Sequence, residues 1–330
     1  MDRIYLEEAI RDHPRVRTIL ERFPASRVTL CERYTEVFNP RAQNFRLQKK
    51  RPALILAEKH GDPVWPTPPG YGIGAGRNYY FSHMLNCLYD CRYCFLQGMY
   101  PSANYVHFVN YEHFERGIDE LAEREDPGDL CFFTGYDCDS LALESITGFA
   151  SYFLPFFAER PELWWELRTK SLATTVLEEW KEPLPRAVVA YTLSPDAVAR
   201  MFEHGAPPVA RRIDRLASLA RQGWQVGLRL DPLLPWPGFE TVYGSLLDEV
   251  FEAVPVGSIH SVTVGTMRFP KAMFDRIRKL YPTDPLFALA ELTTHGGQTG
   301  FRSEVEEELV SPVLDRLHRD LPRERVFRQK

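Results

Sequence analysis

The chain has 330 residues, of which 44% are hydrophobic and 26% are charged, and its formal net charge is −5 at pH 7. A chain of this length can bury one large α/β core with terminal additions, and its small negative charge offers no overall attraction to nucleic acid. It has no run of about 18 apolar residues, its first residues are charged where a secretory signal would be apolar, and its six cysteines do not form an extracellular disulfide pattern. We therefore expect a soluble, cytoplasmic protein that does not associate with membranes.

Residues 1–76 are predicted to form an N-terminal extension. This segment is rich in arginine and ends in a proline- and glycine-rich stretch, residues 66–76, that is typical of turns. Within it, residues 41–51 form a basic run. We expect a solvated surface there, and the alternative is a nucleic-acid contact if the fold brings the run beside the active site.

From residue 77 to residue 285, apolar strand-like segments alternate with segments of helical periodicity. This alternation predicts an α/β domain with a parallel sheet, and ligand-binding groups are expected at the carboxyl ends of its strands. Residues 286–330 are predicted to form a C-terminal capping segment with a helix over 303–320. The expected strands are 79–85, 130–134, 163–168, 187–193, 225–230 and 259–264.

Three cysteines, Cys87, Cys91 and Cys94, follow the first expected strand with the spacing C-x3-C-x2-C. Four thiolates would saturate a 4Fe-4S cluster, whereas three leave one iron free to bind a substrate or cofactor. The alternative is a structural zinc site, although zinc sites usually have paired C-x2-C motifs separated by a dozen or more residues. The candidates for a fourth zinc ligand are His83, Cys31, Cys131 and Cys138.

The cysteine spacing resembles that of the radical S-adenosylmethionine (SAM) enzymes. In that superfamily the amino and carboxylate groups of SAM chelate the fourth iron of the 4Fe-4S cluster, and reductive cleavage of SAM yields a 5′-deoxyadenosyl radical. The resemblance implies that the six predicted strands form a partial (β/α)6 barrel of the TIM type. It also implies an electron donor such as flavodoxin or ferredoxin.

Further segments resemble the spore photoproduct lyase family over roughly 200 residues. They include Tyr93–Gln97, Arg168–Ser171, Val189–Ser194 and Glu203–Pro208. This resemblance implies a radical SAM lyase that repairs thymine photoproducts in DNA by abstracting and then returning a hydrogen atom. Two other hypotheses stay open, namely a radical SAM enzyme of the same scaffold with a different substrate, and a structural zinc-binding module.

The resemblance also suggests which residues hold SAM. Lys170 matches the family lysine that binds the SAM carboxylate, a task that suits an ammonium group. Thr134 and Gly135 end the second strand, where many radical SAM proteins hold the SAM amino group, and a glycine lets the backbone approach a ligand closely. Thr192 and Ser194 end the fourth strand and are predicted to hydrogen-bond SAM, although strand-end hydroxyls also form local backbone bonds.

The loop after the second expected strand contains the candidates for the residue that returns the hydrogen atom. In the family a cysteine after the second strand is the donor, since an S–H bond is weak enough to give up hydrogen to a carbon radical. An ungapped match puts Tyr136 at that position, with Cys138 two residues later. We expect the loop to present Cys138 as the donor, with Tyr93 and Tyr136 as relay residues, and the alternative is that Cys138 is only a small buried residue. Phe95 stands where the lyase usually has a tyrosine, which removes one relay candidate.

DNA that contains damaged thymines is the predicted partner. An enzyme that acts on a base in a duplex must take it out of the stack and hold the backbone. The DNA-contacting C-terminal region of the family is rich in lysine, arginine and tyrosine, whereas residues 293–302 of this chain have few charges and several glycines. This difference, together with the displaced cysteine and the acidic net charge, favours the alternative of another substrate.

Overall fold

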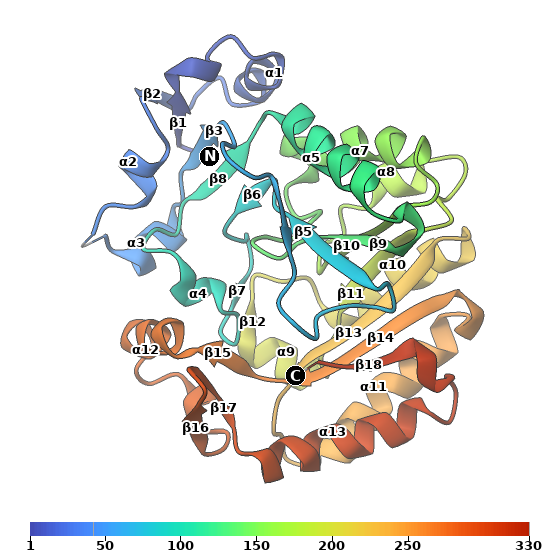
Figure 1. The fold of residues 1–330 in the computed structure, drawn as a ribbon. Helices are drawn as coiled ribbons and strands as arrows, with labels where there is room; N and C mark the ends of the chain where they lie inside the picture. Colours follow the sequence, from blue (N-terminus) through green and yellow to red (C-terminus); the bar gives the residue numbers. More distant parts are fainter. Residues whose placement is uncertain (42, 330) are drawn as a thin grey trace.

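The computed structural model describes residues 1–41 and 43–329, and its main element is a curled eight-stranded sheet with the order β18-β14-β13-β11-β10-β9-β5-β4 (Figure 1). Neighbouring strands from β5 to β18 run parallel, and β4 pairs antiparallel with β5 at one edge. Because parallel strands all end on the same edge, the loops that follow them converge there. The strands are β4 (Val64–Pro66), β5 (Arg77–Phe81), β9 (Leu130–Thr134), β10 (Trp164–Thr169), β11 (Ala187–Thr192), β13 (Gln225–Leu233), β14 (Ile259–Thr266) and β18 (Val326–Arg328).

Each of the six strands expected from the sequence is present, and the expected partial barrel is confirmed as the architecture of this sheet. Strands β9 and β11 are buried along their whole length, as expected of strands that are covered on both faces of a parallel sheet. The expected first strand, 79–85, is two strands, because the chain leaves the large sheet after β5 and enters a second sheet as β6 (Met84–Leu85).

Helices cover the outer side of the curled sheet (Figure 1). In α5, Tyr111, Phe114 and Ile118 are buried at the spacing of one helix face, and the apolar residues of α10 follow the same pattern. Burial of this face orients each helix against the strands. The helices on this side are α5 (Tyr111–Arg124), α7 (Phe149–Ala158), α8 (Thr175–Glu178), α10 (Val209–Arg221), α11 (Phe239–Ala253) and α13 (Ser303–Leu317).

A second sheet has the order β2-β1-β3-β8-β6 and combines the N-terminal residues with residues from the middle of the chain. Here β6 and β8 come from either side of the three cysteines, and β8 pairs with β3 in parallel. The predicted N-terminal extension therefore shares a sheet with the cysteine-containing segment. The strands of this sheet besides β6 are β1 (Arg3–Glu7), β2 (Arg27–Cys31), β3 (Leu54–Ala57) and β8 (Tyr105–Phe108). The helices of the N-terminal residues are α1 (Pro14–Arg22), α2 (Thr35–Phe38) and α3 (Phe45–Lys50).

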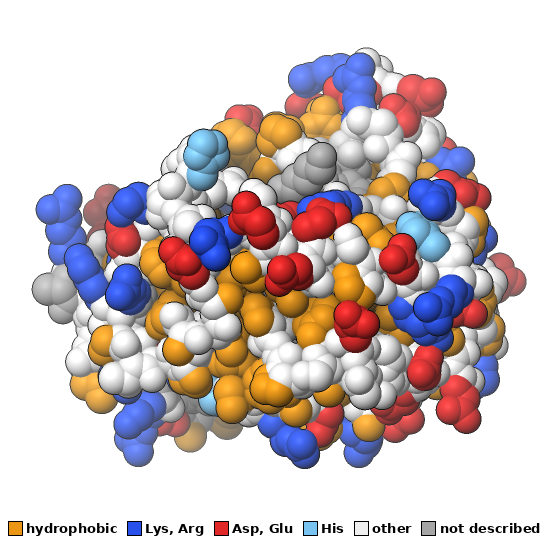
Figure 2. All heavy atoms as spheres, turned by 90° about the horizontal axis from the view of Figure 1, so that it is seen from below, with side chains coloured by type: hydrophobic (Ala, Val, Ile, Leu, Met, Phe, Trp, Pro, Cys, Tyr) orange, Lys and Arg blue, Asp and Glu red, His pale blue; other side chains and the backbone are white. Residues whose placement is uncertain are grey.

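A small antiparallel sheet with the order β15-β17-β16 lies beside α12 and joins residues before 285 to the C-terminal segment. On the face seen in Figure 2, basic and acidic side chains are interspersed around apolar ones, so that face presents no charge of a single sign. Among residues 1–41 and 43–329, no helix is both long enough and apolar enough to cross a membrane. The elements are β15 (Arg268–Pro270), α12 (Lys271–Leu280), β16 (Leu292–His295) and β17 (Gln298–Phe301).

Candidate active site

A cavity of about 570 Å³ opens where the parallel strands of the large sheet end. All three clustered cysteines line it, together with residues from the carboxyl ends of five strands. This is the edge at which a barrel of this kind assembles its ligand-binding groups. The strand-end residues are Gly135 after β9, Lys170 after β10, Thr192 in β11, Asp231 in β13 and Thr266 in β14.

The cysteines lie on the segment 86–95, called the cysteine loop below, between β6 and α4 (Leu96–Met99). At its start Asn86 has a positive φ of 70°, and its side-chain amide donates to the carbonyl oxygens of Ser102 at 2.8 Å and Asn104 at 2.7 Å. In its middle, β7 (Asp90–Cys91) pairs with β12 (Glu203–His204). The loop is therefore fixed at both places before any ligand binds.

The free thiols of the cysteine loop favour their protonated form. Burial, aided by the nearby Asp139 carboxylate and opposed by the Lys49 ammonium, raises the pKa of Cys87 to about 12. Burial likewise raises the pKa values of the other two thiols, against the attraction of Lys170. Since a bound metal deprotonates its coordinating thiols, these cysteines would become thiolates only as metal ligands.

The remaining three cysteines lie outside the cysteine loop, and of these only Cys138 borders the cavity. Cys31 is in β2, Cys131 is buried within β9, and the Cys138 sulfur lies 3.9 Å from Nδ1 of His83. Across residues 1–41 and 43–329, no three His, Cys, Asp or Glu side chains converge closely enough to hold a single metal ion.

Lys170 enters the cavity directly after β10. Its backbone N–H donates to Oδ2 of Asp139 at 2.7 Å, and Oδ1 of the same carboxylate accepts from the Thr169 hydroxyl at 2.7 Å. The Lys170 ammonium lies 5.5 Å from the centre of the Tyr93 ring. Burial alone would lower the pKa of Lys170, but Cys91 and Glu203 raise it above its usual value. Lys170 is therefore a cation held at the cavity. Asp139, which was not predicted from the sequence, fixes the position of the Lys170 backbone.

A buried ion pair supports the wall behind Tyr93. The Tyr93 hydroxyl donates to Glu203, and the Glu203 carboxylate pairs with Arg212 at 2.5 Å. Burial alone would raise the pKa of Glu203, but Lys170 and Arg212 hold it below its usual value. Glu203 lies in one of the segments that carry the family resemblance, but its contact with Tyr93 and Arg212 depends on the fold and could not be predicted from the sequence.

The other predicted SAM-binding residues differ in how they face the cavity. Gly135 and Thr192 line it. Gly135 has a φ of +85°, and a Cβ at this position would lie 2.8 Å from the Arg168 carbonyl oxygen, so only glycine fits there. The Thr134 hydroxyl instead donates to the Glu166 carbonyl oxygen at 2.8 Å, and the Ser194 hydroxyl donates to Glu203 at 3.2 Å. These two hydroxyls already have protein partners.

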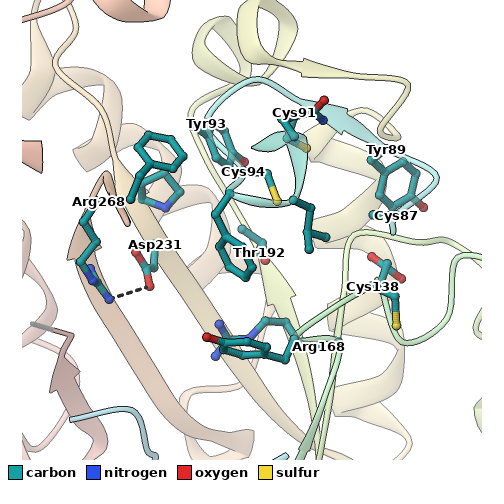
Figure 3. A pocket seen from close by; sticks show the side chains of 18 of the residues that line it. Cys87, Tyr89, Cys91, Tyr93, Cys94, Cys138, Arg168, Thr192, Asp231 and Arg268 are labelled. Atoms are coloured by element: carbon teal, nitrogen blue, oxygen red, sulfur yellow. Dashed lines mark ion pairs between the residues drawn. The ribbon is translucent and has the colours of Figure 1, made fainter. Parts of the chain in front are cut away.

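Tyr136 and Cys138 turn in different directions. Tyr136 stacks on Tyr80, with 4.5 Å between ring centres, and its ring centre lies 5.5 Å from that of Phe95 in the cysteine loop. The Cys138 side chain packs with apolar residues of the N-terminal sheet, and in Figure 3 its sulfur points away from the three clustered cysteines. The backbone of this loop thus borders the cavity, while the two side chains contact different surroundings.

The wall opposite the cysteines carries charges that are paired within the protein (Figure 3). Arg268 lies 3.6 Å from Asp231, and Arg168 donates to Glu166 at 3.0 Å. Arg168 had no role of its own predicted from the sequence. Lys49 belongs to the basic run 41–51, for which a solvated surface was expected unless the fold brings it beside the active site, and it lines the cavity.

Comparisons with known proteins agree with this geometry. The family model described as spore photoproduct lyase matches residues 76–308. A curated relative, the spore photoproduct lyase of Bacillus subtilis (strain 168), is 24% identical over 203 residues, which are 61% of this chain and 59% of that protein. The match therefore spans less than two thirds of the length of the relative. The resemblance recognised from the cysteine spacing and the later segments is confirmed at the level of the family.

Solved structures confirm the fold. One is a doubly substituted spore photoproduct lyase with bound AdoMet and dinucleoside spore photoproduct, with a TM-score of 0.84 at 17% identity. Another is a spore photoproduct lyase complexed with dinucleoside spore photoproduct, with a TM-score of 0.81 at 17% identity. Each comparison covers 100% of this chain and 98% of the other. At this identity they establish the architecture, including the N-terminal sheet.

Proposed function

Since the chain belongs to the spore photoproduct lyase family, we propose that it is a radical SAM lyase that repairs thymine photoproducts in DNA. The observation that carries this proposal is the position of the three clustered cysteines, which line one cavity together with the strand ends of a partial barrel. When bound, a 4Fe-4S cluster with SAM on its open iron would supply the 5′-deoxyadenosyl radical that starts the reaction.

Cys87, Cys91 and Cys94 are the proposed ligands of the cluster. Each thiolate of such a cluster binds its own iron, so the sulfur atoms need not converge on one point. This fits three cysteines that share a cavity without forming a single-ion site. The same feature speaks against the zinc-module hypothesis.

Lys170, Gly135 and Thr192 are the proposed contacts of SAM. The charged Lys170 side chain would bind the SAM carboxylate, and the exposed backbone at Gly135 would receive the amino group. Thr192 offers its hydroxyl from the neighbouring strand. Thr134 and Ser194 would assist indirectly, since their hydroxyls hold the Glu166 carbonyl and the Glu203 carboxylate.

Cys138 is the proposed hydrogen-atom donor, and Tyr93 and Tyr136 are the proposed relay residues. Donation by Cys138 requires its side chain to turn from His83 toward the cavity that its residue already borders. Tyr136 needs no such turn, because its ring lies on the cavity side among Tyr80 and Phe95. Tyr136 is therefore the alternative donor.

A radical SAM enzyme with a different substrate is the second candidate. The observation that favours it is this same loop, in which a tyrosine faces the cavity and the thiol does not. Either activity would need a one-electron donor, and we propose a flavodoxin or ferredoxin in a reducing cytoplasm. DNA with damaged thymines is the proposed partner for the first candidate.

The test is a repair assay with the anaerobically reconstituted protein, SAM, dithionite and DNA that contains spore photoproduct. We expect the photoproduct to revert to thymines, and we expect a variant with Cys87, Cys91 and Cys94 all replaced by alanine to show only background. A matched control is Cys31→Ala, because Cys31 lies in β2 outside the cavity.

The outcomes separate the hypotheses. Formation of 5′-deoxyadenosine without repair would refute the photoproduct assignment and support another substrate. A colourless preparation that contains zinc and no iron would refute radical chemistry altogether.

A further inference from the structure

Lys49 reaches the cysteine loop from the N-terminal part of the chain. It lies at the end of α3, a short helix that begins after Asn44, whose side chain accepts from the Leu47 N–H at 3.0 Å. Buried Phe45 anchors the helix. Lys49 is partly buried, whereas the next residue, Lys50, is exposed. Adjacent lysines of the same helix thus differ in their surroundings.

The Lys49 ammonium binds two carbonyl oxygens of the cysteine loop. Its Nζ donates to the Cys87 oxygen at 2.8 Å and to the Tyr89 oxygen at 3.2 Å. Both carbonyls lie between the first and second clustered cysteines. A lysine ammonium has three N–H donors, so these contacts use two of them and hold the side chain in place.

This contact puts a positive charge beside the thiols. Lys49 lines the same cavity as the three cysteines, and Lys170 enters that cavity from the end of β10. The two lysines come from different sheets. The cysteine loop is therefore flanked by one ammonium from the N-terminal sheet region and one from the barrel.

A fixed charge at this position has a defined effect on an iron-sulfur centre. Reduction adds one negative charge to a group that three thiolates already make electron-rich, and a nearby cation stabilises the reduced state. The interaction is stronger at buried than at exposed positions because water screens it less. Groups outside the direct ligands commonly tune a metal centre in this way.

We propose that Lys49 is a positioning residue that holds the Cys87–Tyr89 segment and raises the reduction potential of the cluster. This inference rests on the proposed function, since it requires a cluster on the three cysteines. Electron entry would thereby depend on a residue of the N-terminal segment, outside the barrel that supplies the strand-end residues.

The test is a redox titration of the reconstituted protein, followed by electron paramagnetic resonance of the reduced cluster. For Lys49→Gln we expect the ratio of reduced to oxidised cluster at a fixed potential to fall about tenfold, which is a midpoint lower by about 59 mV for a one-electron couple. Lys49→Arg keeps the charge and is expected to stay near the wild-type midpoint. Lys50→Gln removes an exposed charge one residue away and serves as the matched control. Iron content and melting temperature are measured for every variant.

Three results would overturn the inference. One is a Lys49→Gln midpoint equal to that of Lys50→Gln, and another is a Lys49→Arg midpoint as low as that of Lys49→Gln. The third is a wild-type chain that takes up no iron, which would contradict the proposed function as well. The first two leave the proposed function intact, so the two failures are distinguishable.

Discussion

At the scale of single residues, the loop after β9 places the side chains of Tyr136 and Cys138, two positions apart, in different surroundings. Gly135 turns the chain with a φ of +85°, which takes the backbone out of the strand alternation. Tyr136 then joins the aromatic side chains at the cavity, while Cys138 packs toward the N-terminal sheet. The orientation of these two side chains therefore decides which of them can return the hydrogen atom.

Substitution of both residues tests the donor assignment. If Cys138 is the donor, Cys138→Ala should still cleave SAM but lose most of its clean repair, because no thiol would then return a hydrogen atom to the substrate radical. Tyr136→Phe, which removes only a hydroxyl, should then keep most of the repair. The measurement is repaired thymine per 5′-deoxyadenosine formed.

The reverse pattern would assign the role to Tyr136. Cys131→Ala provides the control, because Cys131 is a buried thiol in the adjacent strand that does not line the cavity. Loss of repair in this control as well would mean that removal of a nearby buried thiol disturbs the fold.

At the scale of elements, a buried ion pair ties β10 to β13 across β11. Arg229 donates to Glu166 at 2.7 Å and 3.1 Å, and both side chains are fully buried. The guanidinium passes over Gly227, where an added Cβ would lie 2.6 Å from an Arg229 nitrogen. The glycine at this position therefore makes room for the pair.

Breaking this pair on one side should destabilise the protein strongly. Arg229→Met leaves Glu166 buried with only Arg168 beside it, and we expect a loss of about 3 kcal/mol in the free energy of unfolding. The double variant Glu166→Leu/Arg229→Met removes both charges and should be less destabilised than the single one. Urea unfolding measures both, and equal losses would contradict the explanation.

The same pair implies a dependence on pH. Burial alone would raise the pKa of Glu166, but Arg229 and Arg168 hold it below its usual 4.5. Its stabilising contribution is therefore present above that value and is lost as the pH falls through the lowered pKa. The difference in unfolding free energy between the wild type and the double variant should shrink on acidification below about pH 4.

At the scale of the whole molecule, the cysteine loop connects three parts of the structure. The chain leaves the large sheet after β5 and enters the N-terminal sheet as β6. After the cysteine loop it returns to the N-terminal sheet as β8. The α4 helix that follows the cysteines packs on α12, which lies beside the small sheet β15-β17-β16, and a Cβ on Gly98 would lie 2.4 Å from the Met273 carbonyl oxygen. A ligand held by this loop would stabilise contacts among all three parts.

Removal of metal should therefore lower the stability of the whole chain. A ligand that binds only the folded state stabilises it by mass action, so we expect the chelated protein to melt several degrees below the reconstituted one. Limited proteolysis should cut the chelated protein first near residues 84–104. The variant with all three clustered cysteines replaced by alanine should melt at one temperature with or without iron, and a difference there would point to a metal site elsewhere.

Much of this architecture could be predicted from the sequence. Strands β9 and β11 were recognisable because a parallel strand covered on both faces is apolar throughout. The division at Ser82 was not, since no glycine or proline marks it and the polar residues there, Ser82 and His83, are buried like their apolar neighbours. In the basic run 41–51, Lys50 is exposed as expected, but the place of Lys49 at the cavity could not be predicted, because a run of basic residues looks the same whether one of its members faces water or a cavity.

The sequence by itself determined the family, the partial barrel and the clustered cysteines, because each of these depends on residues that are close together in the chain or on a repeated pattern of burial. Only the tertiary structure decided that Asp139 holds Lys170, that Glu203 and Arg212 support Tyr93, and that Lys49 meets the cysteine loop. It also decided which way Tyr136 and Cys138 face. These contacts join residues from separate loops, and their directions depend on how the two sheets pack against one another.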